Sequence, residues 1–208
     1  MWKAILITVL AGYLLGNLNG AVSMSVLQGK DDVRSKGSGN AGLTNFIRNF
    51  GAARAILVVL IDMSKAVIAC IAGGLILEPF GYELEGMMLG AVAVSLGHDF
   101  PALLGFRGGK GILSGFAIAM TIDYRCGLII LAVFAVSFFL TRYVSLSSIL
   151  GAIGFGVSFA VLYQDRIWIM LGGILIGSLA VFMHRTNIQR LIKGTESRVS
   201  FGKKEKQQ

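Results

Sequence analysis

A run of glycines and polar residues in the first long polar segment could bind an oxyanion. It comprises Gly37, Ser38, Gly39, Asn40, Thr44, Asn45 and Arg48. Glycines at this density let successive backbone N–H groups point into one concavity, to which hydroxyl, amide and guanidinium donors can be added. The alternative is a flexible linker rich in small polar residues. The composition favours the oxyanion site.

A second glycine-rich segment leads directly into an apolar run. It contains Gly97, His98, Arg107, Gly108, Gly109, Lys110 and Gly111. A glycine loop that feeds a helix N-terminus, with a lysine among the glycines, suits an anion by its geometry and by the helix dipole. It is not a Walker P-loop, because Gly111 stands where that motif needs Ser or Thr. Arg107 and Lys110 could instead be anchors of membrane topology.

Two further groups follow later in the chain. They are Arg142, Ser145 and Ser148, and then His184, Asn187 and Glu196. Ser145 and Ser148 are three residues apart, as are His184 and Asn187, so each pair shares one face of a helix. Taken alone, such serines are usually helix caps and such a histidine is usually structural. No paired carboxylates or histidine cluster stand at ligand spacing, so we expect no metal and no cofactor.

The elements that must position these groups are membrane helices. The chain has 208 residues, of which 55% are hydrophobic and 14% charged, too apolar for an ordinary soluble domain. Apolar runs cover residues 4–27, 52–77, 86–96, 111–122, 126–140, 144–163 and 167–183. We therefore expect an all-α, polytopic bundle of seven transmembrane helices. Five is the fallback, because three of the runs are shorter than the ~20 residues of a straight span.

The distribution of charge predicts the orientation of this bundle. The net charge is +8, with 19 Lys and Arg. If the N-terminus is outside and the C-terminus inside, only Lys3, Arg125 and Arg166 fall outside, and Lys65 lies within the second run. This satisfies the positive-inside rule and places all four polar groups on the inner face. A nucleic-acid partner is not needed to explain the charge, and the lysines from Lys203 to Lys206 can contact anionic lipid.

Other residues within the runs are expected to have structural roles. Asp62 and Lys65 should pair, because unpaired charges inside a membrane are costly. Glycines at four-residue spacing predict close helix packing on the first run, at Gly12, Gly16 and Gly20, and on the last, at Gly173 and Gly177. We expect one domain over residues 1–208, with a short basic cytoplasmic tail from about residue 198.

In order and at these intervals, the four groups resemble the motifs of the bacterial acyl-phosphate:glycerol-3-phosphate acyltransferases, the PlsY family. The resemblance runs from the first span to the tail and includes Asp32-Val33-Arg34 and Asp62-x-x-Lys65. It departs from the family pattern at Ala41, where proline is usual, and at Arg107, where lysine is usual.

The resemblance implies transfer of a fatty acyl group from acyl phosphate to the 1-hydroxyl of sn-glycerol 3-phosphate, giving lysophosphatidic acid and phosphate. It implies a multi-pass protein of the bacterial cytoplasmic membrane, with its active site facing the cytoplasm. A functional link to the soluble enzyme that makes acyl phosphate is also implied.

The resemblance likewise assigns roles to residues. Catalytic roles are implied for Ser38, Lys110, His184 and Asn187. Substrate or phosphate binding is implied for Gly37, Gly39, Asn40, Thr44, Asn45, Arg48, Gly97, His98, Arg107, Gly108, Gly109, Gly111, Arg142, Ser145, Ser148 and Glu196. The proton of the attacking hydroxyl could go to His184 or to an oxygen of the acyl phosphate itself.

A transporter for a phosphorylated metabolite is the alternative function. Basic glycine loops among membrane helices would also serve such a protein. Transporters usually carry broken helices or paired halves at mid-membrane, whereas here the polar groups gather at one face. The sequence thus favours the acyltransferase.

Overall fold

The computed structural model describes residues 1–29 and 31–199, so Lys30 and the Lys203 to Lys206 tail lie outside the described residues. Within them every regular element is a helix, which confirms the all-α prediction. The α-helices are α1 (Trp2–Gly16), α2 (Gly20–Leu27), α3 (Leu43–Phe50), α4 (Ala55–Leu77), α5 (Glu83–Asp99), α6 (Ile112–Ile122), α7 (Tyr124–Thr141), α8 (Val144–Leu162), α9 (Ile167–Met183) and α10 (Arg185–Ile192). Short 3-10 turns are η1 (Val33–Ser35), η2 (Glu78–Phe80) and η3 (Ala102–Leu104).

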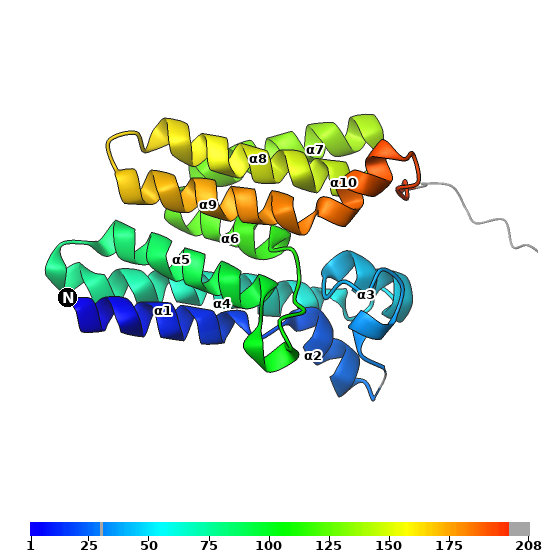
Figure 1. The fold of residues 1–208 in the computed structure, drawn as a ribbon, viewed down its shortest axis with the longest axis horizontal. Helices are drawn as coiled ribbons and strands as arrows, with labels where there is room; N and C mark the ends of the chain where they lie inside the picture. The colour runs from blue at the N-terminus through cyan, green and yellow to red at the C-terminus, as the bar shows by residue number, and fades with distance from the viewer. Residues whose placement is uncertain (30, 200–208) are drawn as a thin grey trace, which may run out of the picture.

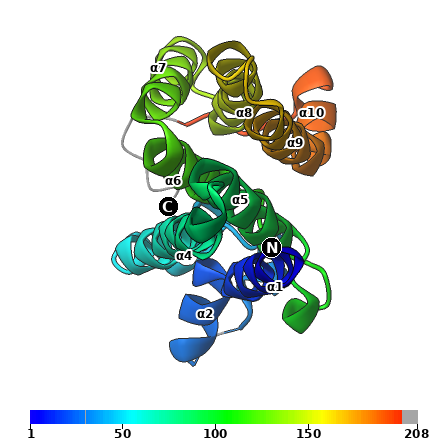
Figure 2. The ribbon, with the colours of Figure 1, turned by 90° about the vertical axis from the view of Figure 1, so that its left-hand side faces the viewer.

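The long helices run side by side in two groups. Helices α1, α4 and α5 pack together, α7 and α9 pack on either side of α8, and α6 contacts both groups (Figures 1 and 2). The short helices α2, α3 and α10 lie at one end of the bundle, and the N-terminus lies at the other (Figure 1). The polar groups predicted from the sequence therefore gather at one end.

The helix lengths agree with most of the predicted spans. Four segments of the described chain are long and apolar enough to cross a membrane, namely Ala55–Phe80, Glu83–Leu104, Tyr124–Thr141 and Val144–Leu162. The pairs α1 with α2 and α9 with α10 also qualify but are bent by 43° and 55°. Helix α6 is about 17 Å long, roughly half of a bilayer core. The count of seven spans and the orientation of the termini stay predictions.

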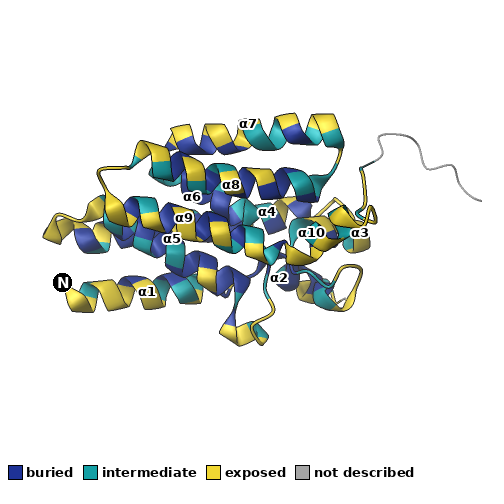
Figure 3. Ribbon diagram, turned by 45° about the horizontal axis from the view of Figure 1, so that its top comes forward, coloured by how far each residue is buried: buried dark blue, intermediate teal, exposed yellow. Residues whose placement is uncertain are grey.

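The outer surface of the bundle is apolar, as lipid contact requires. Large apolar residues such as Leu140 (80% exposed), Phe139 (74%) and Trp168 (68%) are exposed. Exposed positions recur along the long helices (Figure 3). A patch of this extent is not tolerated in water by a monomeric protein. Between the helices, small residues allow close approach. A Cβ atom at Gly97 would lie 2.1 Å from the carbonyl oxygen of Tyr13, so α1 and α5 touch backbone to backbone.

The first apolar run is broken, which corrects the prediction that Gly20 shares a helix with Gly12 and Gly16. Helix α1 ends at Gly16 and α2 begins at Gly20. The side chain of Asn19 caps α2 by accepting a hydrogen bond from the N–H of Val22 at 3.0 Å. Gly20 still packs closely, because a Cβ there would lie 2.7 Å from the carbonyl oxygen of Val58 on α4.

The buried pair of Asp62 and Lys65 satisfies the backbone groups that this break exposes. Lys65 Nζ lies 2.9 Å from Asp62 Oδ1, which confirms the predicted pairing. The same ammonium donates to the carbonyl oxygens of Leu18 and, at 3.4 Å, of Gly16, while Gly20 N–H donates to Asp62 Oδ1 at 3.1 Å. Backbone groups cannot remain unsatisfied within a membrane, so the ion pair makes the broken helix possible.

Candidate active site

The four polar groups predicted from the sequence meet around one cavity of about 410 Å³. It lies at the end of the bundle that carries α3 and α10 (Figure 1). The predicted site residues that line it are Ser38, Asn40, Thr44, Asn45, Arg48, His98, Lys110, Gly111, Ser145, Ser148, His184, Asn187 and Glu196. Segments as far apart in the sequence as Ser38 and Glu196 therefore build one site.

The remaining predicted site residues do not line this cavity. They are Gly37, Gly39, Gly97, Arg107, Gly108, Gly109 and Arg142. Several support the residues that do. A Cβ at Gly109 would lie 2.1 Å from His98 Nε2, and a Cβ at Gly37 would lie 2.5 Å from Asn45 Oδ1. Direct contact of these residues with substrate stays a prediction.

Asn45 organises the first glycine loop. Its buried amide donates to the carbonyl oxygens of Val33 (2.9 Å), Lys36 (3.1 Å) and Asn40 (3.0 Å). Its Oδ1 accepts from the backbone N–H of Ser38 at 3.0 Å. The side chain is thus committed to the loop itself, and it holds the Ser38 backbone in place.

Helix α3 presents its N-terminus beside this loop. Gly42 is its N-cap and makes no side-chain cap hydrogen bond. The first N–H groups of a helix have no partner within it, so they and the helix dipole favour an anion here. Gly42, Leu43, Thr44 and Arg48 all line the cavity. The first loop therefore offers backbone, hydroxyl and guanidinium donors together.

A buried histidine, His98, packs against the second glycine loop, which contains Gly109 and Lys110. His98 Nδ1 lies 2.7 Å from Lys65 Nζ, and because an ammonium only donates, Nδ1 is the acceptor. In neutral imidazole the proton is then on Nε2, the atom that faces Gly109. Gly109 N–H in turn donates to the carbonyl oxygen of His98 at 3.1 Å. The Asp62–Lys65 pair thus supports both the helix break and the loop that carries Lys110.

Lys110 enters a polar network with α10 and the segment that follows it. Its ammonium donates to Asn187 Oδ1, and Asn187 Nδ2 donates to Glu196 Oε1 at 2.9 Å. Arg190 Nε donates to Glu196 Oε2 at 2.6 Å. Burial, reinforced by the positive charge of Arg190, lowers the pKa of Lys110 to about 8. Lys110 is therefore a cation close to its titration point at neutral pH.

Glu196 stays ionised within this network. Burial acts to raise the pKa of its carboxyl, but hydrogen bonds from Arg190 and Asn187 outweigh burial and hold that pKa below its usual range. The carboxylate thus orients two groups that line the cavity.

His184 lies between α9 and α10 and offers one ring nitrogen to the cavity. Its Nδ1 lies 2.8 Å from the carbonyl oxygen of Ala180. A carbonyl only accepts, so Nδ1 carries the proton, and Nε2 of the neutral ring is an acceptor. Ser145 and Ser148 lie opposite on α8, both buried and both lining the cavity, as their shared helix face predicts.

Some cavity residues were missed at the sequence level. Arg190 stands three residues after Asn187 on α10, and this spacing could have revealed it. Asp62 also reaches the cavity from α4, although the sequence predicted for it only a pairing role with Lys65. Apolar residues complete the lining, among them Ile112, Leu113 and Phe134.

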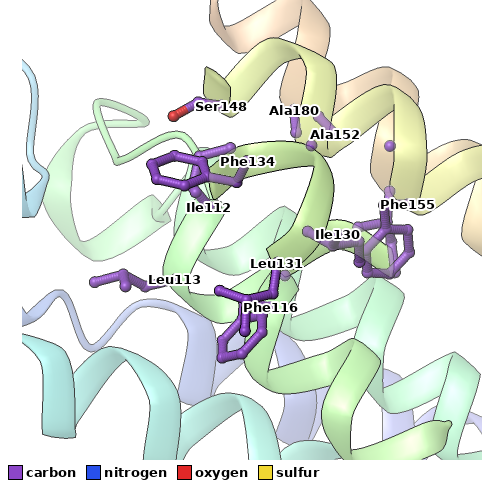
Figure 4. Close-up of a pocket in the computed structure, with 15 residues that line it drawn as sticks. Ile112, Leu113, Phe116, Ile130, Leu131, Phe134, Ser148, Ala152, Phe155 and Ala180 are labelled. Carbon is purple, nitrogen blue, oxygen red and sulfur yellow. The ribbon is translucent and has the colours of Figure 1, made fainter. Parts of the chain in front are cut away.

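A second, apolar cavity of about 200 Å³ adjoins the first. It lies among α6, α7, α8 and α9, and Figure 4 shows the side chains around it. The two cavities share Gly111, Ile112, Leu113, Phe134 and Ser148. A polar, cationic site therefore lies directly beside an apolar one.

Comparisons with known proteins agree with this geometry. The family model described as glycerol-3-phosphate acyltransferase matches residues 6–194. A glycerol-3-phosphate acyltransferase of Thermoanaerobacter pseudethanolicus is 39% identical over 193 residues, covering 93% of this chain and 94% of that protein. A protein of the same name from Shewanella baltica (strain OS155) is 36% identical over 205 residues, covering 97% and 96%.

Solved structures show the same likeness. The crystal structure of PlsY (YgiH), described as an integral membrane glycerol 3-phosphate acyltransferase, in its glycerol 3-phosphate form, superposes with a TM-score of 0.83 at 32% identity. It covers 94% of this chain and 96% of that one. Its lysophosphatidic acid form gives a TM-score of 0.81 at 31% identity. The apolar helices and this likeness make the chain a multi-pass membrane protein.

Proposed function

The chain belongs to the glycerol-3-phosphate acyltransferase family, and we propose that it transfers a fatty acyl group from acyl phosphate to the 1-hydroxyl of sn-glycerol 3-phosphate. The products are lysophosphatidic acid and inorganic phosphate. This is the first acylation of phospholipid synthesis, and it requires no metal and no cofactor.

The observation that carries this proposal is the junction of the two cavities. A fatty acyl phosphate has a doubly charged head, a carbonyl carbon and a long apolar tail. The polar cavity can take the head, the apolar cavity the tail, and the carbonyl then lies beside the shared residues Gly111, Phe134 and Ser148. Glycerol 3-phosphate, which has no tail, fits the remaining part of the polar cavity.

The reaction needs little more than positioning and charge stabilisation. The hydroxyl oxygen of glycerol 3-phosphate attacks the acyl carbon, the carbon–oxygen bond to phosphate breaks, and phosphate leaves with the bonding electrons. Lys110 and the Ser38 loop neutralise the charge that grows on the leaving phosphate, and Arg48 binds glycerol 3-phosphate. The hydroxyl proton passes either to a phosphate oxygen or to His184 Nε2. Asn187 and Ser148 order the two substrates.

The other residues assigned from the family resemblance complete these two phosphate sites. Gly37, Gly39 and Asn40 shape the first loop, and Gly108, Gly109 and Gly111 shape the second. We place the whole site at the cytoplasmic face of the bacterial cell membrane. Acyl phosphate from the soluble enzyme that makes it would then arrive on the same side as glycerol 3-phosphate.

One assay tests this function. Purified protein in detergent receives palmitoyl phosphate and glycerol 3-phosphate, and phosphate release and lysophosphatidate are measured together. We expect both products in equal amounts, and no product when palmitoyl coenzyme A replaces palmitoyl phosphate. Phosphate transport by the protein in vesicles without either product would favour the alternative, a transporter of phosphorylated metabolites.

A further inference from the structure

A stack of aromatic rings along the C-terminal half of α8 begins at the apolar cavity. Phe155 lines the cavity and is 3% exposed (Figure 4). The ring of Phe159 lies behind it, with the two centroids 4.9 Å apart, and Tyr163 lies 5.6 Å beyond Phe159. Neither Phe159 nor Tyr163 lines the cavity. Along α8, the cavity therefore extends no further than Phe155.

This stack is fixed at its far end. The hydroxyl group of Tyr163 lies 3.0 Å from Asp123 Oδ2, at the turn between α6 and α7. The same carboxylate lies 2.7 Å from the guanidinium of Arg125. Phe159 itself is fully buried. Phe155 is thus backed by a packed column, and interiors packed in this way yield little to a ligand that pushes against them.

The opposite end of the cavity is the junction with the polar site. Ser148 lies at that end and Phe155 at the other, as Figure 4 shows. The two residues are on one helix, so the rise of an α-helix puts their Cα atoms about 10 Å apart along the axis. A straight tail whose carbonyl is held near Ser148 therefore meets Phe155 after about 10 Å, and a longer tail such as palmitoyl must bend at that point.

We propose that Phe155, backed by Phe159 and Tyr163, is the stop against which the acyl chain ends and thereby sets the chain-length preference of the enzyme. This inference rests on the proposed function, since it requires an acyl tail in the apolar cavity. A tail that is too long must bend or displace the stack, and a tail that is too short leaves the inner end unfilled. Each misplaced methylene then lowers kcat/KM.

Two glycines on the cavity wall allow the cavity to be made shallower, which should shift the preference toward shorter acyl chains. A Cβ at Gly151 would have no contact closer than 3.6 Å, and a Cβ at Gly115 would meet nothing within 4 Å. Both residues line the cavity. A Cβ atom at Gly151 can therefore occupy cavity space without moving backbone, and a larger side chain there meets only the side chains of Ile130 and Phe134 and the carbonyl oxygen of Ile130 at first contact.

The first experiment deepens the cavity. Phe155→Ala is assayed with a series of saturated acyl phosphates from hexanoyl to stearoyl phosphate, and kcat/KM is measured for each. We expect the preferred chain to lengthen, with the ratio of kcat/KM for long against short donors rising roughly tenfold. Phe139→Ala is the matched control, because Phe139 is 74% exposed and does not line either cavity. Its profile should equal that of the unaltered protein.

The second experiment makes the cavity shallower and does not depend on the first variant folding. Gly151→Val should shift the preference toward shorter donors by a similar factor. An active Phe155→Ala or Gly151→Val enzyme whose chain-length ratio is unchanged would overturn the inference and leave the proposed function standing. Absence of transfer from every acyl phosphate by the unaltered protein would overturn the proposed function, and this inference with it.

Discussion

Lys110 and Arg107 stand three residues apart in one glycine loop, yet only Lys110 lines the cavity. We expect Lys110→Ala to lower kcat/KM by roughly 10² to 10³, the usual effect of losing a preorganised donor to developing charge. Arg107 is exposed, and its carbonyl oxygen, not its guanidinium, accepts a hydrogen bond from Arg34. Arg107→Ala should change kcat/KM only a few-fold. Near-normal turnover of Lys110→Ala with palmitoyl phosphate would contradict the assignment.

The pKa of Lys110 predicts the alkaline limb of the pH profile. Burial lowers this pKa to about 8, so the free enzyme carries the cation below that pH and loses it above. We expect kcat/KM, which reports the free enzyme, to fall as pH rises through about 8. Lys110→Arg keeps its charge at any such pH, so its profile should lack this limb even if its activity is lower. The same limb in Lys110→Arg would assign the titration to another group.

His184 can be tested as the group that takes the hydroxyl proton. Because Nδ1 donates to Ala180, Nε2 is the available acceptor, and we expect His184→Gln to lower kcat/KM by roughly 10² to 10⁴. The measurement is kcat/KM across pH, with thermal unfolding to show that the fold is kept. Unchanged kcat/KM and an unchanged profile would instead give the proton to the acyl-phosphate oxygen.

At this scale, residue type and spacing predicted most of the cavity lining. Ser145 and Ser148 do share a face of α8, and His184 and Asn187 also line the cavity, although His184 lies at the bend between α9 and α10 and not within one helix with Asn187. Residue type and spacing could not predict what each side chain binds, because that depends on partners elsewhere in the chain. Asn45 is an apparent donor in sequence, but its amide is used by the loop that contains Ser38.

At the scale of the element, the Asp62–Lys65 pair predicts a large stability effect. Lys65→Met would leave Asp62 unpaired and the carbonyl oxygens of Gly16 and Leu18 unsatisfied. Removing one partner of a buried ion pair costs about 3–5 kcal/mol. We expect a marked fall in the Tm of the purified protein in detergent.

The matched control for Lys65→Met is the exposed pair of Arg166 and Glu85, 3.3 Å apart at the other end of the bundle. An exposed pair is worth roughly 1 kcal/mol or less, so Arg166→Met should barely change the Tm. Equal shifts for the two variants would mean that the helix break does not depend on Lys65.

The break between α1 and α2 shows why helix boundaries were harder to predict than helices. The apolar runs located every long helix, since hydropathy reports burial or lipid contact directly. Near the break, only Asn17 and Asn19 interrupt the apolar run, and an asparagine is tolerated within a helix. The partners that stabilise a break there, Asp62 and Lys65, lie more than forty residues further along the chain. No local pattern could contain that information.

At the scale of the whole molecule, the polar groups lie at one end of the bundle because successive long helices run in opposite directions. Each long helix begins at the end where its predecessor finished. The loops that carry Ser38 and Lys110, the start of α8 with Ser145, and the junction at His184 therefore fall at one end. The loops around Gly81 and Asp165 fall at the other (Figure 1). The enzyme can therefore face one compartment with its entire polar site while its apolar cavity remains among the helices.

The alternating direction of the helices predicts which loops face the outside and which face the cytoplasm. The distribution of charge in the sequence makes the same prediction. If α1, α4, α5, α6, α7, α8 and α9 all cross, Asp165 and the turn at Tyr124 face outward, whereas Lys193 faces the cytoplasm. Single cysteines at these positions can be compared in a Cys70→Ala, Cys126→Ala background. The two native cysteines are free thiols, and this background removes both of them. A membrane-impermeant thiol reagent should label Asp165→Cys and Tyr124→Cys in intact cells, and Lys193→Cys only after lysis. Labelling of Tyr124→Cys only after lysis would mean that the short helix α6 enters the membrane without crossing it.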